Sequence, residues 1–377
     1  MAKVLYLSIF DNSKVLSNGV MKKINLHIDC LKSYGNEVDY AFTDGTNVFF
    51  HTPNETILLG EKKYNGYLYF NRLMFLCKQA IKKRKIKYDY IYIRYVAFSF
   101  RGFSCLKYLS KICKGIYLEF PTFFIPKKNP KNFIKYYFNK HLHKYVYKAV
   151  VDSLDKTAYG METLRVINGT DLSKIKPRIP TYSPVINVVL MAYLQDYHGV
   201  DKIIHATKNY YENEGKREIL FHIVGEGPMF RKYVSECKKQ NVENRIIFYG
   251  NLSGKPLDDV LNKCEIGISS LSNKEIGVTC SSTLKSKEYL AKGLPVLSDT
   301  MLDVFVDNPK YFFYQLKESF NINELISFYD YVYLKRDKMQ VINDIRRFAD
   351  KTCNMYKVFE IVNNDYLMHL ANIEVKK

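Results

Sequence analysis

Residues 282–299 read STLKSKEYLAKGLPVLSD, a stretch in which a helix with a polar beginning is followed by an apolar strand. Ser281, Ser282 and Thr283 are small hydroxyl residues of the kind that begin helices, and Gly293-Leu294-Pro295-Val296 follows the helical pattern. The first turn of such a helix presents free N–H groups and a positive dipole end, which together can bind a diphosphate. The stretch therefore predicts an anion-binding helix beside a strand of an α/β sheet.

Two charged residues follow the first turn of this predicted helix. Lys285 adds positive charge, and Glu288, on the same face three residues later, can accept hydrogen bonds from ribose or sugar hydroxyls. An ordinary capped helix carrying a surface ion pair between these two residues explains the same pattern. Both interpretations stay open on spacing alone.

Strand and helix patterns alternate on both sides of this stretch. Apolar and β-branched runs predict strands at 4–9, 37–42, 90–95, 116–120, 149–151, 185–191, 219–224, 245–249, 266–270 and 294–298. Amphipathic segments lie between them, and residues 322–370 have a helical pattern. Alternation at this spacing predicts an α/β protein with two Rossmann-like parallel sheets.

Three prolines between Asp171 and Pro184 predict a break between the two sheets. We expect an N-terminal domain over residues 1–175, a linker over 176–184 and a C-terminal domain over 185–352. A final helix over 353–377 is expected to pack back on the N-terminal domain. Ligands bind at the carboxyl ends of parallel strands, so we expect the two domains to face each other across a ligand-binding cleft.

The positive charge of the chain is concentrated in one region. The net charge is +19, and residues 78–148 alone hold 18 Lys and Arg against two acids, Asp89 and Glu119. Lysines and aromatic residues interleave within 127–148, a mixture suited to an anionic bilayer surface. We expect a membrane or acceptor contact there through Lys127, Lys128, Lys131 and Lys135. A partly buried helix with a solvated basic face remains an alternative, and no nucleic-acid-binding motif accompanies the charge.

Two features of the N-terminal half are candidate ligand contacts. Gly19 lies between the first predicted strand and helix, where a glycine permits close approach of the backbone to a ligand. Glu119 ends an apolar strand in the basic region, a position suited to acceptor binding or proton transfer. A plain turn and a charge partner for nearby lysines, respectively, are the structural alternatives.

Several classes of protein are not supported by the sequence. The first nine residues, MAKVLYLSI, predict a strand rather than a secretory signal, and no apolar run reaches the length of a membrane span. The eight cysteines have neither disulfide-like nor zinc-like spacing. No phosphate loop of the Gly-x-x-x-x-Gly-Lys-Ser/Thr type is present, which argues against a P-loop kinase or ATPase.

Five segments, in order along the chain, resemble the GT-B retaining glycosyltransferases of family 4. They are LEFPT (118–122), VINGTDL (166–172), AYLQDYHGVDKII (192–204), the Gly225-Glu226-Gly227-Pro228 region within 222–252, and the stretch 282–299. More specifically, they resemble a bacterial subgroup that builds surface polysaccharides such as capsule, lipopolysaccharide or exopolysaccharide. The resemblance covers nearly the whole chain.

The resemblance implies a metal-independent transferase that moves a sugar, with retention, from a UDP- or GDP-sugar to a glycan or lipid-linked acceptor. No cofactor is implied, since the nucleotide sugar is a co-substrate. The expected location is the cytoplasmic face of the cell membrane. The implied catalytic residues are Glu119, His198 and Glu288; the implied donor-binding residues are Gly19, Tyr193, His198, Lys202, Gly225, Glu226, Gly227, Ser281, Ser282, Thr283, Lys285 and Glu288.

The chain departs from the family at two places. The first of two glutamates spaced eight apart is Cys280 here, and Glu275 is a nearby substitute. The usual phosphate-binding Arg and Lys positions fall on Tyr193 and His198. The phosphate contacts are then expected from His198, Lys202, Lys285 and the helix N-terminus, with His198 titrating between about pH 5.5 and 7.5.

Two other functions remain possible on sequence grounds. A nucleotide-sugar epimerase on the same scaffold would also use carboxylates in both domains, and its product would be an isomerised nucleotide sugar. The replacement at Cys280 also fits a catalytically weak partner subunit.

Overall fold

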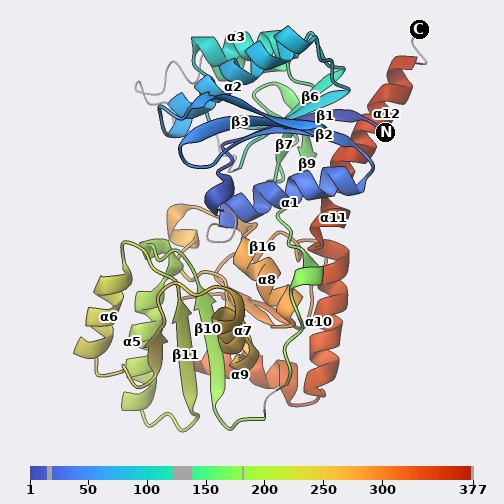
Figure 1. The fold of residues 1–377 in the computed structure, drawn as a ribbon. Coiled ribbons are helices and arrows are strands. Elements are labelled where there is room, and N and C mark those ends of the chain that lie inside the picture. Colours follow the sequence, from blue (N-terminus) through green and yellow to red (C-terminus); the bar gives the residue numbers. More distant parts are fainter. Residues whose placement is uncertain (15–18, 122–137, 181, 375–377) are drawn as a thin grey trace. The chain divides into compact units, whose positions relative to one another are not determined.

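The computed structural model describes residues 1–14, 19–121, 138–180 and 182–374. The chain divides into two compact units. Unit 1 comprises Met1–Ile167 and Met355–Lys377, and unit 2 comprises Asn168–Asn354. Each unit is built on its own sheet, with helices packed around it (Figure 1).

Unit 1 contains a nine-stranded sheet in the order β4-β3-β2-β1-β5-β6-β7-β9-β8. Its central strands are parallel, whereas β3 and β4 form an antiparallel hairpin at one edge. The strands are β1 (Lys3–Leu7), β2 (Glu37–Thr43), β3 (Asn47–Thr52), β4 (Glu55–Glu61), β5 (Tyr90–Arg94), β6 (Gly115–Glu119), β7 (Lys148–Val151), β8 (Thr157–Ala158) and β9 (Met161–Arg165).

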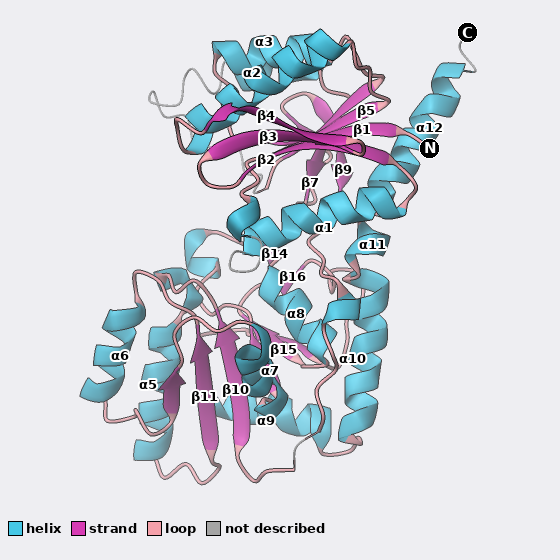
Figure 2. Cartoon of the chain, in the orientation of Figure 1, coloured by secondary structure: helices cyan, strands magenta, loops and turns pink. Residues whose placement is uncertain are grey.

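Helices cover both faces of this sheet (Figure 2). Alternate residues of β1 point to opposite faces, so Leu5 and Leu7 join one apolar core while Val4 and Tyr6 join the other. The first core includes α2 (Gly66–Arg84) and α3 (Phe100–Leu109); the second includes α1 (Gly19–Ser33), α11 (Met355–Val358) and α12 (Glu360–Glu374).

Unit 2 contains a six-stranded parallel sheet in the order β12-β11-β10-β13-β15-β17. Central strand β10 is buried on both faces, as expected for a parallel sheet covered by helices. The strands are β10 (Ile186–Met191), β11 (Ile219–Val224), β12 (Ile246–Phe248), β13 (Ile266–Ile268), β15 (Val296–Ser298) and β17 (Phe313–Gln315). Its α-helices are α5 (Val200–Glu212), α6 (Phe230–Lys239), α7 (Gly254–Lys263), α8 (Leu284–Lys292), α9 (Ile322–Tyr333) and α10 (Lys338–Thr352).

The predicted fold class, an α/β protein with two Rossmann-like sheets and a helical C-terminus, is confirmed. Several short or exposed strands were not predicted, among them β3, β4, β9 and β17. In β4 all seven residues are at least partly exposed, so the strand lacks the apolar alternation on which the prediction depended. The predicted helical region 322–370 forms four separate helices, α9 to α12.

The boundaries of the two units differ from those expected from the prolines. The chain passes from unit 1 to unit 2 after Ile167, and the expected linker 176–184 lies within unit 2. Within the segment 353–377, expected to pack on the N-terminal domain, α11 and α12 cover 355–358 and 360–374 and belong to unit 1. Aromatic contacts hold them there: His27 of α1 stacks on Phe359, with ring centroids 4.3 Å apart.

An ion pair inside unit 2 fixes the position of α8. Lys287 on α8 and Asp303, which follows the short strand β16 (Met301–Leu302), are paired and almost completely inaccessible to solvent. Asp303 also accepts the backbone N–H of Val304 at 2.9 Å. Charges buried to this degree are tolerated only when they are paired.

We expect Lys287→Met to lower the free energy of unfolding by about 3–5 kcal/mol, because it leaves a carboxylate buried without its cation. Urea denaturation followed by circular dichroism measures the change. The matched control is Lys255→Met, which removes one partner of the exposed pair between Lys255 and Asp259. That change should cost no more than about 1 kcal/mol, and equal losses in the two variants would contradict the prediction.

Candidate functional site

The carboxyl ends of the strands of unit 2 meet at one edge of its sheet. The segment after β10 and the segment after β13 are joined there, since the Leu271 N–H donates to the His198 carbonyl at 3.3 Å. The Ser270 hydroxyl donates to the Tyr197 carbonyl at 2.7 Å. The N-terminus of α8 and Asp299, which follows β15, belong to the same edge. Such an edge is where α/β folds bind ligands.

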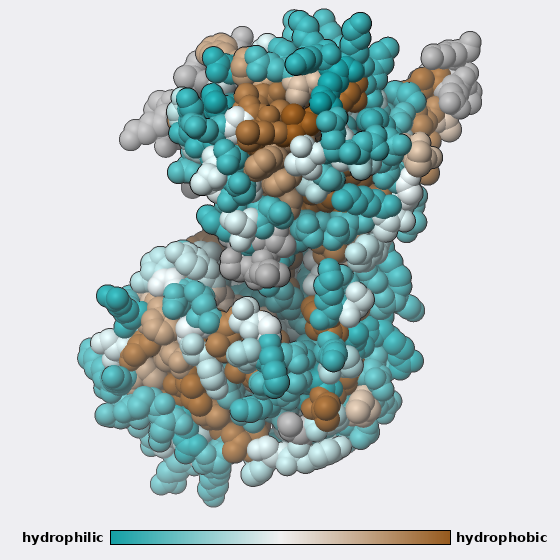
Figure 3. Space-filling model, viewed as in Figure 1, coloured by the Kyte–Doolittle hydropathy of each residue, from teal (hydrophilic) through white to brown (hydrophobic). Residues whose placement is uncertain are grey.

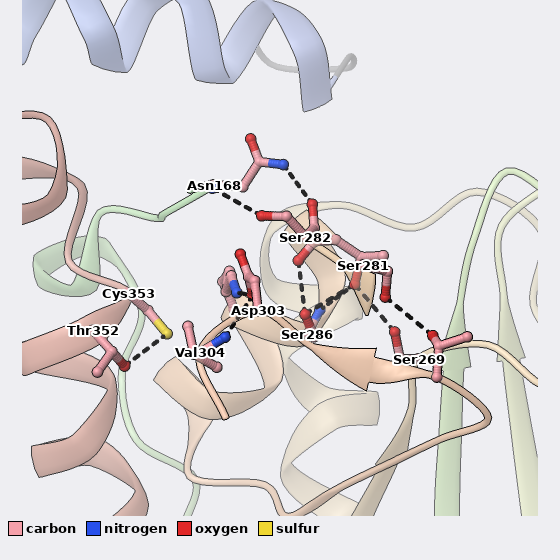
Figure 4. A network of polar contacts seen from close by, with 12 residues as sticks. Asn168, Ser269, Ser281, Ser282, Ser286, Asp303, Val304, Thr352 and Cys353 are labelled. Carbon is pink, nitrogen blue, oxygen red and sulfur yellow. Dashed lines mark hydrogen bonds and ion pairs between the residues drawn. The ribbon is translucent and has the colours of Figure 1, made fainter. Parts of the chain in front are cut away.

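Hydroxyl side chains order the first turn of α8 (Figure 4). Thr283 is the N-cap residue, and its side chain accepts the N–H of Ser286. The Thr283 hydroxyl also lies 3.1 Å from the hydroxyl of Ser269, and the hydroxyl of Ser281 lies 3.4 Å from that of Thr300. The remaining N–H groups of a first helical turn have no partner within the helix, so this end of α8 is suited to an anion.

Lys285 adds a cation to this turn. Its Nζ is buried and has no hydrogen-bond partner among the described residues. Burial lowers the pKa of Lys285 to about 7, against the opposing effect of the Asp299 carboxylate. The Oδ1 of Asp299 is likewise buried without a hydrogen-bond partner among those residues. The surface ion pair with Glu288 considered from the spacing is therefore not formed by Lys285.

Glu288 lies one turn further along α8 and is partly exposed. Cys280, at the position of the missing glutamate, lies in the short strand β14 (Cys280–Ser281). Glu275 is exposed and forms an ion pair with Lys202 at 2.6 Å. Lys202 also donates to the Leu271 carbonyl at 2.8 Å, so its ammonium group holds the loop after β13 in this structure.

His198 is buried at the end of the segment that follows β10. Its Nδ1 accepts the backbone N–H of Gln195 at 3.1 Å, which leaves Nε2 as the protonated nitrogen and a possible donor. Burial, followed by the charge of Lys285, lowers the pKa of His198 to about 3. The expectation that His198 titrates between about pH 5.5 and 7.5 is therefore wrong for the ligand-free protein. The pKa of Lys285, at about 7, lies near neutrality instead.

Two glycines after β11 allow close packing against the segment that follows β10. Gly225 has φ of +123° and Gly227 has φ of +154°. A Cβ at Gly225 would overlap the carbonyl oxygen of Ala192, and a Cβ at Gly227 would lie 2.5 Å from that of Leu194. The two glycines thus allow the segments after β10 and β11 to pack closely against each other at the carboxyl edge of the sheet.

Glu226 and Tyr193 are exposed residues of these two segments. Glu226 accepts a hydrogen bond from the side chain of Asn251 at 3.1 Å. The side chain of Tyr193 is 68% exposed, so its ring is available to a planar ligand.

The structure therefore brings most predicted donor-binding residues to one edge of unit 2. Gly19, which begins α1, and Glu119, which ends β6, belong to unit 1. The four lysines of the predicted membrane contact, 127, 128, 131 and 135, lie outside the described residues.

Glu119 is 4% exposed and lies within a network of charged and polar groups. Its Oε1 accepts hydrogen bonds from Lys23 at 3.0 Å and from Arg94. Its Oε2 accepts the Tyr92 hydroxyl at 3.2 Å and lies 3.8 Å from His27 Nδ1. Burial alone would raise the pKa of Glu119, but the charges of Arg94 and Lys23 outweigh it and hold the pKa well below the usual range.

The carboxylate of Glu119 is thus ionised and a weak base, which fits the positioning of Lys23 and Arg94 better than proton transfer. The adjoining pocket is lined by Lys23, Glu119, Pro121 and Asp152 among others, and its interior has room for about one water molecule. This pocket is too small for a sugar.

Three residues of these two sites were not singled out from the sequence: Lys23, Arg94 and Asp299. Arg94 and Asp299 end or follow strands, the same signal that identified Glu119. Lys23 carried no such signal, because its role depends on how α1 crosses the ends of β5 and β6. Across the described residues, no three His, Cys, Asp or Glu side chains gather in a way that could bind a metal ion.

Residues 173–301 match the family model described as Glycosyl transferases group 1. This match lies within unit 2 and includes every residue of its site edge named above. No curated protein sequence matches the chain.

Solved structures match over almost the whole length. A glycosyltransferase from Rickettsia africae is 14% identical, with coverage of 98% of this chain and 99% of that one and a TM-score of 0.69. Sucrose-phosphate synthase from Thermosynechococcus elongatus is 13% identical, with coverage of 99% and 100% and a TM-score of 0.68. Anabaena HepE in complex with UDP and glucose is 14% identical, with coverage of 97% and 99% and a TM-score of 0.57. The chain thus has the GT-B fold, and the family match covers 173–301 of unit 2.

The buried Nζ of Lys285 leads to a test in which stability and binding change in opposite directions. The pKa of this ammonium group is about 7 in the folded protein, against an ordinary lysine value of 10.5. Between these values the unfolded chain binds more protons, so stability increases with pH. Lys285→Met should stabilise the ligand-free protein by roughly 1–2 kcal/mol at pH 7, with the gain declining toward pH 10.

The same variant should bind nucleoside diphosphates at least about tenfold more weakly. Thermal melts at pH 7 and pH 10 and calorimetric titrations with UDP and GDP measure the two effects. A destabilised variant with unchanged binding would show that the ammonium group is only structural.

Proposed function

We propose that this protein is a glycosyltransferase that binds a nucleotide-sugar donor at the carboxyl edge of the unit 2 sheet. The observation that carries the proposal is the buried ammonium group of Lys285, in the first turn of α8, which has no hydrogen-bond partner among the described residues. A cation buried without a partner lowers stability, so its presence beside a helix N-terminus is best explained by an anionic ligand. The family match over residues 173–301 supports a sugar transferase.

A diphosphate at this edge would be contacted by three groups: the first-turn N–H groups of α8, the ammonium group of Lys285 and the Nε2–H of His198. In the transfer, the bond between the sugar C1 and the diphosphate oxygen breaks, and a bond from C1 to the acceptor hydroxyl oxygen forms. The acceptor proton leaves with the diphosphate. Positive groups arranged in advance stabilise the charge that develops on the leaving diphosphate, which supports a metal-independent reaction.

Other side chains at this edge have the chemistry to bind the base and the sugar of the donor. The exposed ring of Tyr193 and the pair of Glu226 with Asn251 are suited to a nucleoside base, and the carboxylate of Glu288 to sugar or ribose hydroxyls. The Anabaena structure that shares the fold contains UDP and glucose. These points support a UDP- or GDP-sugar donor, transferred with retention as in the family 4 enzymes that the sequence resembles.

The acceptor that we propose is a glycan or a lipid-linked saccharide of bacterial surface polysaccharide synthesis. One of the solved structures that share the fold is a lipopolysaccharide outer core galactosyltransferase, and the sequence resembles the surface-polysaccharide subgroup. In unit 1, Glu119 and Arg94 end neighbouring strands, and Lys23 is bonded to Glu119. Their mutual ion pairs support a role in shaping the acceptor surface.

The test is donor use, and Glu288→Gln provides the matched variant. Incubation with UDP-, GDP- and ADP-sugars, with release of the nucleoside diphosphate as readout, should identify one active donor. Glu288→Gln keeps the shape but loses charge-assisted hydrogen bonds, so turnover should fall at least about tenfold with folding intact. Turnover equal to the wild type would remove Glu288 from the site.

The same incubation separates the alternative functions. An epimerase would convert the donor into an isomeric nucleotide sugar without release of diphosphate. A catalytically weak partner subunit, suggested by Cys280, would bind the donor without consuming it. Binding of no nucleotide at all would overturn the proposed function.

We also place the protein at the cytoplasmic face of an anionic membrane, with the basic part of unit 1 as the contact. Helices α2 and α3 pack side by side, and Lys82, Lys83, Arg101 and Lys107 on them are exposed. Much of the surface over these helices is hydrophilic (Figure 3). Phe100, at the N-terminus of α3, is 74% exposed and supplies an apolar contact. Within the described ranges, no helix has the length and apolarity needed to cross a bilayer.

Sedimentation with vesicles tests the membrane contact. The wild type should sediment with phosphatidylglycerol vesicles and be released by salt, because each basic residue near an anionic surface contributes on the order of 1 kcal/mol. Replacement of Lys127, Lys128, Lys131 and Lys135 by Glu, or of Lys82, Lys83, Arg101 and Lys107, should abolish sedimentation.

The matched control replaces four exposed cations of α6 in unit 2, Arg231, Lys232, Lys238 and Lys239, by Glu. This control has the same net charge as either test variant and should still sediment. Equal sedimentation with neutral vesicles, or loss in the control as well, would argue against a localised contact.

A further inference from the structure

The point where the chain enters unit 2 is bonded directly to the first turn of α8. Asn168 is the first residue of unit 2. Its backbone N–H donates to the hydroxyl of Ser282 at 2.9 Å, and its side-chain Nδ2 donates to the Ser282 carbonyl (Figure 4). Ser282 immediately precedes Thr283, the N-cap residue of α8. One asparagine therefore holds the residue that orients the proposed phosphate-binding turn.

The point where the chain leaves unit 2 is bonded to the same segment. The N–H of Thr170 donates to the carbonyl of Cys353 at 2.8 Å, and Thr170 pairs with Asn354 in a β-bridge. Asn354 is the last residue of unit 2. The entering and leaving segments are thus joined to each other within two residues of Asn168.

Helix α10 continues this connection along α8. Arg346 on α10 donates to the carbonyls of Ile175 and of Ala291, which lies in the last turn of α8. Together with the buried Lys287–Asp303 pair, these bonds hold α8 at both ends and in its middle. A change in the backbone path of the entering segment would therefore shift the positions of Ser282 and Thr283.

We propose that Asn168 is a positioning residue that holds the Ser282–Thr283 turn in the conformation that binds the diphosphate of the donor. The inference rests on the proposed function and deepens it, since it adds a residue outside the phosphate-contacting set. Asn168 does not reach the ligand; it acts through the two hydrogen bonds to Ser282. Because it is the first residue of unit 2, it also connects donor binding to the segment through which the chain passes from one unit to the other.

The physical requirement is the orientation of N–H groups toward an anion. Two hydrogen bonds fix both the carbonyl and the side chain of Ser282, and hence the direction in which the following N–H groups point. Without the side-chain donor the Ser282 peptide can turn, and the N–H groups of the first turn lose their common direction. Anion binding depends on that common direction, whereas contacts to an uncharged nucleoside do not.

The experiment compares UDP with uridine, or GDP with guanosine, according to the donor that the protein uses. In Asn168→Ala and Asn168→Asp, affinity for the diphosphate should fall by about tenfold, the effect expected when a positioning hydrogen bond is lost. Affinity for the nucleoside should stay unchanged. Asn168→Asp retains the size and replaces the Nδ2 donor by an acceptor, so it tests the bond with little effect on packing.

Asn354→Ala is the matched control, because it removes an asparagine side chain that donates to Asp350 of α10 at 2.9 Å. It should leave both affinities unchanged. Equal diphosphate affinity in the wild type and both Asn168 variants would overturn the inference. Parallel loss of diphosphate and nucleoside binding, or failure of both variants to fold, would also overturn it, because the residue would then support the fold alone. If the wild type binds no nucleotide, the proposed function fails instead.

Discussion

The placement of α8 is the constraint on which the site in unit 2 depends. The ion pair between Lys287 and Asp303 has essentially no exposure to solvent, so it cannot be exchanged for hydration and it sets the rotation of the helix. With that rotation the Nζ of Lys285 is buried and Glu288 is partly exposed. The hydroxyls of Thr283 and Ser269 then order the turn, and Asn168 holds the residue before it. A helix that was free to rotate would not keep Lys285 buried and Glu288 partly exposed at this edge.

The site lowers the stability of the ligand-free protein, as expected for groups that are arranged to bind a ligand. Lys285 and Asp299 each have a buried polar atom without a hydrogen-bond partner among the described residues, and such groups lower the stability of a ligand-free protein. His198 is kept neutral by burial and by the charge of Lys285. The positive charge is therefore concentrated on one ammonium group whose pKa lies near neutrality. Glu119 in unit 1 is the opposite case, a carboxylate whose charge is fully compensated by Arg94 and Lys23. The two sets of groups are thus suited to different tasks, one to an incoming anion and the other to a fixed surface.

Part of the site could be predicted because its residues are close together in sequence. Ser281 to Glu288 lie in one segment, and the hydroxyl-rich start of a helix identified the anion site directly. The glycines at 225 and 227 were identified too, although the structure shows them serving the packing of two backbone segments. By contrast, the roles of Lys202 and His198 depended on partners far away in the sequence: Lys202 is bonded to Glu275 and Leu271. Asn168 belongs to a segment recognised for its resemblance, but its contact with Ser282 spans 114 positions and leaves no local signal.

The sequence by itself determined the fold class, because the alternation of apolar strands and amphipathic helices is a local pattern that parallel sheets impose on every segment. It also determined where the first turn of α8 begins. Only the tertiary structure decided the edges of the sheets, where β4 and β17 are too short or too exposed to show a pattern, and the boundary between the units after Ile167. The tertiary structure also decided which charges are compensated. The ionisation of Lys285, His198 and Glu119 depends on burial and on charges brought near by other elements, and neither quantity is encoded in the residues next to them.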